Sequence, residues 1–193
     1  MSYSSRQRPA GVGGVILAGG KSLRMGCDKA TLPFAGRPLF DRVLDFMLAR
    51  FNQVIIAGDR PDLARPGVPF FPDPYPGSAM GGLYTGLLNS STPWVMVAPC
   101  DMPHPSNELA DRLLAHRGEG EVVVPRTPQG LEPLFALYHQ ACLPYVRKYL
   151  EQGNFRIIDL FSEARVYYLD WAEEVPNINT REEYESQLRE ENK

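Results

Sequence analysis

The sequence predicts an α/β fold with three layers, in which a mostly parallel sheet carries helices on both faces. Short apolar runs with the length of buried strands alternate with segments of helical periodicity through most of the 193 residues. Turns rich in glycine or proline follow several of the apolar runs. Because alternating strands and helices build a parallel sheet that is covered on both sides, these observations predict one compact domain.

The predicted strands are short, apolar and spaced along the whole chain. The first covers residues 15–17 and leads into a glycine-rich stretch. The others cover residues 53–57, 68–71, 94–98, 121–125, 133–138 and 165–169, and a short extended piece covers residues 31–34. We expect the ligand site at the carboxyl ends of these strands, where open parallel sheets bind their ligands.

The predicted helices carry start and stop signals. Pro38 suits the first turn of one helix and Ser106 the N-cap of another, while Gly153 suits a helix end. Thr180 and Glu183 have the spacing of a capping box at the start of the last helix. Before this last helix, helices are expected over residues 39–48, 83–89, from the Ser106 cap through residue 114, and over residues 143–152. A second glycine-rich loop is expected at residues 77–82, before the second of these helices.

The amino-acid composition argues against several classes of function. The net charge of −3 argues against general binding of nucleic acid, and no apolar run reaches the roughly 20 residues that span a bilayer. We expect a disordered tail over residues 1–10, without the apolar centre of a signal peptide, and a single domain over residues 11–193. Three cysteines without a CxxC pair indicate neither a zinc site nor a disulfide framework, so a cytoplasmic location is expected.

The stretch after the first strand has the features of a loop that binds nucleotide phosphates. Gly19, Gly20 and Gly26 allow a close approach of the backbone to a ligand. Arg24 and Lys29 in the same stretch supply positive charge for a polyphosphate. A flexible surface loop is the alternative, but such loops seldom combine these residues directly after a strand.

Two common phosphate-binding motifs do not fit this stretch. Gly20-Lys21-Ser22 resembles the end of a Walker A loop, but Val15 stands where that motif needs a glycine. Gly11 and Gly13 could open a dinucleotide fingerprint, but Ile16 replaces its third glycine. The stretch is therefore a different kind of phosphate loop.

Two aspartates follow predicted strands and face the same edge of the predicted sheet. Asp101 comes directly after an apolar strand, where a carboxylate beside a phosphate site suits Mg²⁺, which takes one or two carboxylates together with water and phosphate. Asp73 follows another strand and lies between two prolines. Each residue could instead stabilise a turn. The neighbouring basic loop favours the metal for Asp101.

The pattern Leu-Ala-Gly-Gly-x-Ser-x-Arg-Met-Gly-x-Asp-Lys at residues 17–29 resembles the signature of the molybdenum cofactor guanylyltransferases. These enzymes belong to the nucleotidyltransferases of Rossmann-like fold. Pro-Cys-Asp-x-Pro at residues 99–103 is similar to the family's metal-binding segment, and Asn-x-Asn-Thr at residues 177–180 is similar to its C-terminal segment. The resemblance covers nearly the whole chain.

The resemblance implies transfer of GMP from GTP to the phosphate of molybdopterin, with release of pyrophosphate. Mg²⁺ on Asp101 is the implied cofactor, and Arg24 and Lys29 would share the catalytic role with Asp101. The implied nucleotide-binding residues are Leu17, Ala18, Gly19, Gly20, Lys29, Asp73 and Asp101. Gly81, Gly82 and Asn179 would lie on the pterin side or in a shared part of the site. Other proteins of molybdenum cofactor biosynthesis and molybdoenzyme chaperones are the implied protein partners.

Two departures from the family pattern affect the contacts to the base. Residues 78–80 are Ser-Ala-Met where relatives usually carry Pro-Leu, and Ala57 stands where relatives often carry an asparagine that contacts the nucleotide. Three alternatives stay open: a cytidylyltransferase for the same cofactor, a nucleotidyltransferase for a sugar or alcohol phosphate, and a non-catalytic GTP-binding regulator. Gly19, which leaves room for a purine, favours guanine, and Asp101 argues against a regulator.

Overall fold

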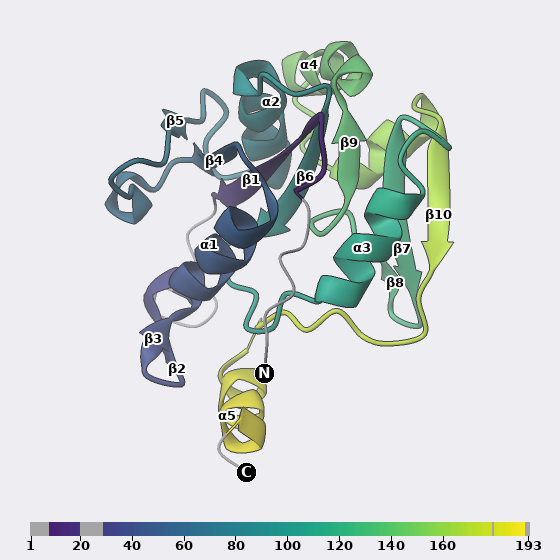
Figure 1. Ribbon diagram of the computed structural model, residues 1–193. Coiled ribbons are helices and arrows are strands. Elements are labelled where there is room, and N and C mark those ends of the chain that lie inside the picture. Colours follow the sequence, from purple (N-terminus) through teal and green to yellow (C-terminus); the bar gives the residue numbers. More distant parts are fainter. Residues whose placement is uncertain (1–7, 20–28, 179, 192–193) are drawn as a thin grey trace.

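A single mixed sheet is the centre of the molecule (Figure 1). The computed structural model describes residues 8–19, 29–178 and 180–191. The strand order is β10-β7-β9-β6-β1-β4-β5, with β8 paired to β7. The strands are β1 (Val12–Ala18), β4 (Val54–Gly58), β5 (Phe70–Pro72), β6 (Trp94–Pro99), β7 (Val122–Thr127), β8 (Gly130–Leu131), β9 (Leu137–His139) and β10 (Val166–Asp170). Only the pairings of β8 and β9 are antiparallel in this sheet, which confirms the predicted mostly parallel α/β fold.

Helices cover both faces of the sheet, as predicted (Figure 1). They are α1 (Leu39–Arg50), α2 (Ala79–Asn89), α3 (Asn107–Ala115), α4 (Leu143–Glu151) and α5 (Arg181–Glu191). Successive side chains of β1 point to opposite faces. Ile16 therefore joins the core cluster that contains residues of α1 and α3, and Val15 and Leu17 join the cluster that contains residues of α2 and α4. No helix in the described part of the chain is long and apolar enough to cross a membrane.

The predicted cap at Ser106, the capping box and the helix stop at Gly153 are present in the structure, whereas Pro38 ends β3 and precedes α1 instead of lying in its first turn. The Ser106 hydroxyl accepts a hydrogen bond of 3.2 Å from the backbone N–H of Leu109. At the start of α5, Glu183 N–H donates to Thr180 Oγ1 at 3.1 Å and Thr180 N–H donates to Glu183 Oε2 at 3.2 Å, which is the predicted capping box. Gly153 follows α4 with φ of +73°, a conformation that favours glycine at a helix end.

Helix α2 begins at Ala79, four residues before the predicted start, so that prediction was wrong. Ser78 is its N-cap and accepts a hydrogen bond of 3.0 Å from Gly81 N–H. Gly81 and Gly82, predicted to lie in a loop, therefore occupy the first turns of the helix. Glycine is a poor helix former, which explains the error. Close packing outweighs that propensity, because a Cβ on Gly86 would lie 2.5 Å from Val15 Cγ1.

The predicted strand at residues 133–138 was also misplaced. Only Leu137–His139 forms a strand, and it runs antiparallel between β6 and β7. The preceding residues turn, with Phe135 N–H donating to the carbonyl of Glu132 at 3.2 Å. The short strand Gly130–Leu131 was not predicted, and Lys29–Thr31 is a 3₁₀ helix instead of the start of an extended piece.

The C-terminal helix packs against a hairpin from the other end of the chain. The hairpin consists of β2 (Pro33–Phe34) and β3 (Arg37–Pro38). Phe34, Leu39 and Ile178 form a small buried cluster, against which Tyr184 of α5 packs. The Tyr184 hydroxyl also donates a hydrogen bond to the carbonyl of Pro33. These contacts join the two ends of the described chain.

The predicted tail is described only in part. Residues 1–7 lie outside the described residues. The Arg8 guanidinium donates to the carbonyl of Leu48 at 2.8 Å and to Asn52 Oδ1 at 3.2 Å. The described chain thus begins with a side chain held against the end of α1.

Candidate functional site

Four parallel strands have their C-terminal ends next to one another, and the predicted site residues follow these ends. This side of the sheet is called its carboxyl edge below. Strand β1 is parallel to β4 and β6, and β4 is parallel to β5. The paired ends are Ala18 with Gly58, Gly58 with Pro72, and Leu17 with Pro99. Gly19, Asp73 and Asp101 therefore all leave the sheet at its carboxyl edge, as the sequence predicts.

Asp101 and Lys29 form an ion pair at this edge. The Lys29 ammonium lies 3.8 Å from Asp101 Oδ2, and the two side chains are 11% and 25% exposed. Burial raises the pKa of Asp101 above its usual value, and the positive charge of Lys29 offsets part of that shift. The site therefore holds a poorly solvated carboxylate next to a nearly buried cation.

The donor set at Asp101 fits a magnesium ion that binds together with a nucleotide. Within the described ranges, no group of three or more histidine, cysteine, aspartate or glutamate side chains is placed to hold a metal ion. A complete protein cage is thus absent from this part of the chain. Mg²⁺ usually takes one or two carboxylates and completes its shell with water and substrate phosphate, and Asp101 can supply that single carboxylate.

Gly58 allows two strand ends to approach closely beside the predicted phosphate loop. A Cβ on Gly58 would lie 2.0 Å from the Ala18 carbonyl oxygen and 2.9 Å from the Gly19 nitrogen. No side chain fits at such distances. In contrast, a Cβ on Gly19 would meet only the Ser78 carbonyl oxygen among the described atoms, at 3.5 Å. Among the described atoms, the space around the backbone thus excludes a side chain at Gly58 and accepts a methyl group at Gly19.

Asp73 is a buried residue in the turn after β5, and one of its two carboxylate oxygens accepts a hydrogen bond from the backbone. Its Oδ1 accepts a hydrogen bond of 2.7 Å from Tyr75 N–H, and its own N–H donates to the Gly58 carbonyl at 3.0 Å. Its Oδ2 is buried and has no hydrogen-bond partner among the described residues. Burial raises the pKa of Asp73, and the charge of Asp59 raises it further. The turn role left open by the sequence is confirmed, while a nucleotide contact stays a prediction.

Gly81 and Gly82 make room for parts of the neighbouring strands. A Cβ on Gly81 would lie 2.2 Å from Asp73 Oδ2. A Cβ on Gly82 would lie 3.2 Å from Leu17 Cδ2 and 3.4 Å from the carbonyl oxygen of Ala57. Both glycines therefore seat α2 against the strand ends. Their assignment to the pterin side stays a prediction.

Some predicted site residues cannot be placed. Gly20, Arg24 and Asn179 lie outside the described residues. Leu17 and Ala18 are buried at the end of β1, and their side chains belong to the two core clusters on opposite faces of the sheet.

Sequence reasoning missed Asp59, the first residue after β4. Its Oδ1 is buried without a hydrogen-bond partner among the described residues. No signal in the sequence distinguishes it from an ordinary turn residue, because Asp59 lies past Gly58, the last residue of β4.

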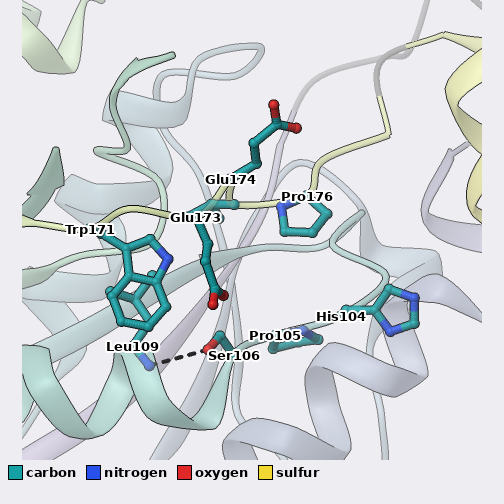
Figure 2. Close-up of a pocket in the computed structure, with 9 residues that line it drawn as sticks. His104, Pro105, Ser106, Leu109, Trp171, Glu173, Glu174 and Pro176 are labelled. Carbon is teal, nitrogen blue, oxygen red and sulfur yellow. Dashed lines mark hydrogen bonds between the residues drawn. The ribbon is translucent and has the colours of Figure 1, made fainter. Parts of the chain in front are cut away.

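The structure also contains a pocket of about 280 Å³ between the start of α3 and the segment that follows β10 (Figure 2). Figure 2 shows the Glu173 side chain pointing toward Ser106, whose hydroxyl is occupied as the cap of α3. None of the predicted site residues that the structure describes lines this pocket. The candidate site is therefore not this pocket. It consists of the Asp101–Lys29 ion pair and the carboxyl ends of the strands β1, β4, β5 and β6.

The chain matches a known family over most of its length. Residues 14–166 match the family model described as the MobA-like NTP transferase domain. The chain is 36% identical over 179 residues to the molybdenum cofactor guanylyltransferase of Vibrio vulnificus (strain YJ016), covering 88% of this chain and 91% of the relative. It is 32% identical over 186 residues to the protein of that name from Vibrio cholerae, covering 91% of each.

Solved structures share the fold. The molybdopterin-guanine dinucleotide biosynthesis protein A of Archaeoglobus fulgidus superposes with a TM-score of 0.79 at 19% identity, covering 93% of this chain and 98% of that one. The 2-C-methyl-D-erythritol 4-phosphate cytidylyltransferase of Thermus thermophilus superposes with a TM-score of 0.71 at 16% identity, covering 93% and 98%. With the sequence match over residues 14–166, these findings show that the chain is a nucleotidyltransferase and belongs to the family of the MobA-like NTP transferase domain.

Proposed function

We propose that this nucleotidyltransferase transfers GMP from GTP to the phosphate of molybdopterin and releases pyrophosphate. A phosphate oxygen of the pterin attacks the α-phosphorus, and the bond from that phosphorus to the oxygen bridging to the β-phosphate breaks. The observation that supports this best is the Asp101–Lys29 pair at the carboxyl edge of the sheet. Names of relatives from Vibrio species supply the base and the acceptor.

The chain contributes position and charge in this proposal. Lys29 binds phosphate oxygens and stabilises the negative charge that develops on the leaving pyrophosphate. Asp101 would hold Mg²⁺, which when bound neutralises charge on the nucleotide oxygens. Arg24 would assist Lys29. No nucleophile from the protein is needed, because the acceptor phosphate is already anionic at neutral pH and has only to be oriented.

The cellular setting belongs to the same proposal. GTP and molybdopterin are the substrates, and other proteins of molybdenum cofactor biosynthesis and molybdoenzyme chaperones are the proposed partners. A reducing cytoplasm is the proposed location, which agrees with Cys142 being a thiol that forms no disulfide within the described residues.

The choice of base tests the proposal. With purified protein, Mg²⁺ and molybdopterin, transfer from GTP should be favoured over CTP, ATP and UTP by roughly a hundredfold or more, because each lost buried hydrogen bond costs about 1–3 kcal/mol. The measurement is kcat/KM for each nucleotide. Higher kcat/KM with CTP would make the protein a cytidylyltransferase. Absence of transfer to molybdopterin from every nucleotide would point to a sugar or alcohol phosphate as acceptor, and binding without any transfer would point to a regulator.

Lys29→Ala should weaken GTP binding and lower turnover, each by about tenfold, because a nearly buried ammonium beside Asp101 is removed. Titration calorimetry measures the first effect and initial rates measure the second. Lys148→Ala is the matched control, since Lys148 of α4 is 53% exposed and pairs with Glu163. Wild-type binding and turnover in Lys29→Ala would show that Lys29 does not face the triphosphate.

A further inference from the structure

Arg42 of α1 contacts the segment of the chain that carries Asp101. Its Nε donates a hydrogen bond of 2.9 Å to the carbonyl oxygen of Pro103, two residues after Asp101. The side chain of Arg42 is 25% exposed, so this hydrogen bond from a charged donor is partly shielded from water, which strengthens it. A guanidinium thus holds the backbone that follows the proposed magnesium ligand.

The two neighbours of Asp101 are held by the sheet and its core. Before Asp101, Cys100 N–H donates a hydrogen bond of 3.3 Å to the carbonyl oxygen of Leu17 in β1. After Asp101, Met102 is fully buried in the core cluster that contains residues of α1 and α3. The hydrogen bond from Arg42 is therefore a third attachment, and it fixes the direction in which the chain leaves Asp101.

Arg42 also contacts the β2–β3 hairpin, which follows Lys29. Its guanidinium lies 5.1 Å from the ring centroid of Phe34, which is fully buried. Lys29 is joined to this hairpin through Leu32, whose N–H donates to the carbonyl of Lys29 at 3.1 Å and whose carbonyl accepts from Leu39 N–H at 3.1 Å. Arg42 therefore contacts both segments that supply the charges of the site.

The separation of Lys29 and Asp101 depends on these segments. Lys29 Nζ and Asp101 Oδ2 are 3.8 Å apart, which is longer than a hydrogen bond, so a direct bond between the two side chains does not fix their distance. Groups that act on a reacting centre need to be held within about 0.5 Å of the productive geometry by the residues around them. A residue that contacts both segments can supply this precision.

The last residue of α5 holds Arg42 in its position. Glu191 Oε1 accepts a hydrogen bond of 3.0 Å from Arg42 Nη2, and Glu191 Oε2 lies 3.4 Å from His104 Nε2. One carboxylate thus contacts both Arg42 and the residue that follows Pro103. The C-terminal helix is thereby connected to the segment of Asp101.

We propose that Arg42 is a positioning residue, which fixes Asp101 relative to Lys29 for binding of the metal and the nucleotide. Glu191 acts through Arg42 by keeping its side chain in place. The inference rests on the proposed role of Asp101 as the magnesium ligand. Arginine suits this role because its fork of nitrogens donates to Pro103 and to Glu191 at once, whereas a lysine keeps the charge but has a single nitrogen.

The experiment measures binding of Mn²⁺, a paramagnetic substitute for Mg²⁺, to the protein–GTP complex by electron paramagnetic resonance, with protein in excess over GTP. In Arg42→Ala the Kd for Mn²⁺ should rise about tenfold, because the segment after Asp101 loses a hydrogen bond from a charged group. Arg42→Lys and Glu191→Ala should each raise this Kd by about threefold. The double variant Arg42→Ala/Glu191→Ala should bind Mn²⁺ as Arg42→Ala does, because Glu191 acts through Arg42.

A second measurement separates positioning from a merely structural role. Titration calorimetry gives the number of GTP molecules bound per chain, which should stay at the wild-type value in Arg42→Ala. A structural role would lower this number, through a fraction of unfolded protein, and leave the Mn²⁺ affinity of the remaining sites unchanged. If Arg42→Ala does not fold, as judged by circular dichroism, Arg42→Lys and Glu191→Ala carry the test.

Arg65→Ala is the matched control. Arg65 also pairs with a carboxylate, its Nη2 lying 2.9 Å from Asp41 Oδ1, and its guanidinium lies 4.8 Å from the ring centroid of Phe40. Its side chain is 31% exposed, close to the 25% of Arg42. Because Phe40 and Asp41 belong to α1, and not to the segments of the two site charges, Arg65→Ala should keep the wild-type Kd for Mn²⁺.

The outcomes separate the inference from the proposed function. Wild-type Mn²⁺ affinity in folded Arg42→Ala, or a change equal to that in Arg65→Ala, would overturn the inference. Additive effects of Arg42→Ala and Glu191→Ala would overturn the role of Glu191. Neither measurement needs molybdopterin, so a wild type that transfers nothing to molybdopterin overturns the proposed function alone. A wild-type GTP complex that does not bind Mn²⁺ overturns both.

Discussion

Asp101→Asn should lower turnover by roughly a hundredfold to a thousandfold while the protein stays folded. Asparagine keeps the shape of the side chain but removes the negative charge that would hold Mg²⁺. Because burial raises the pKa of Asp101, the free wild-type enzyme should gain activity as the pH rises through the acidic range, as this carboxyl loses its proton. The variant should lack that step. The measurements are kcat against Mg²⁺ concentration and kcat/KM against pH, since kcat/KM reports the titration of the free enzyme.

The control for Asp101 is another aspartate at the end of a strand. Asp170 lies on β10, is 77% exposed and pairs with Arg126, so Asp170→Asn should leave turnover unchanged. The melting temperature of Asp101→Asn should stay within about 5 °C of the wild type, since 1 kcal/mol shifts a chain of this size by about 2–4 °C. A folded Asp101→Asn protein with normal magnesium-dependent turnover would contradict the metal assignment.

Gly58→Ala should destabilise the protein by about 1–3 kcal/mol and abolish nucleotide binding. The added methyl carbon would lie 2.0 Å from the Ala18 carbonyl oxygen, so β4 must move away from the end of β1. Both rigid backbones belong to the centre of the sheet, and neither can turn aside as a flexible side chain would. Thermal melting measures the first effect and titration with GTP the second.

Gly19→Ala separates packing from binding. Its methyl group would meet only the Ser78 carbonyl oxygen among the described atoms, at 3.5 Å, so the melting temperature should not change. GTP binding should nevertheless weaken, because a methyl group on Gly19 would crowd the proposed purine base. If Gly58→Ala melts like the wild type and binds GTP normally, the close approach of β1 and β4 has no role in forming the site.

The sequence predicts most of the fold because apolar strands and helix caps are local signals. Ser106, Thr180 and Glu183 each form the predicted cap, since a cap depends on residues within one helical turn. The start of α2 was missed because it depends on distant partners. Val15 and Asp73 fill the space that Gly86 and Gly81 leave open, and no local pattern reveals such contacts.

The sequence predicted those parts of the candidate site in which a charged residue follows a strand closely. Asp101 and Lys29 were named from their places after a strand and in a glycine-rich stretch, and the structure brings them to 3.8 Å. Asp59 was overlooked, because a polar residue in a turn is ordinary until its burial is known. The reversed direction of β9 was not predictable either, since antiparallel pairing depends on the path of the chain between residues 127 and 137.

The packing of α5 on the β2–β3 hairpin affects the order in which the chain can fold during synthesis. Tyr184 and Pro33 are 151 positions apart, and their hydrogen bond joins an early segment to one of the last. A ribosome adds about 5–20 residues per second, so Phe34 and Leu39 wait for roughly seven to thirty seconds before Ile178 can cover them. The cluster of Phe34, Leu39 and Ile178 therefore closes only after residue 178 has been added, and until then the nascent chain carries an apolar surface that chaperones can bind.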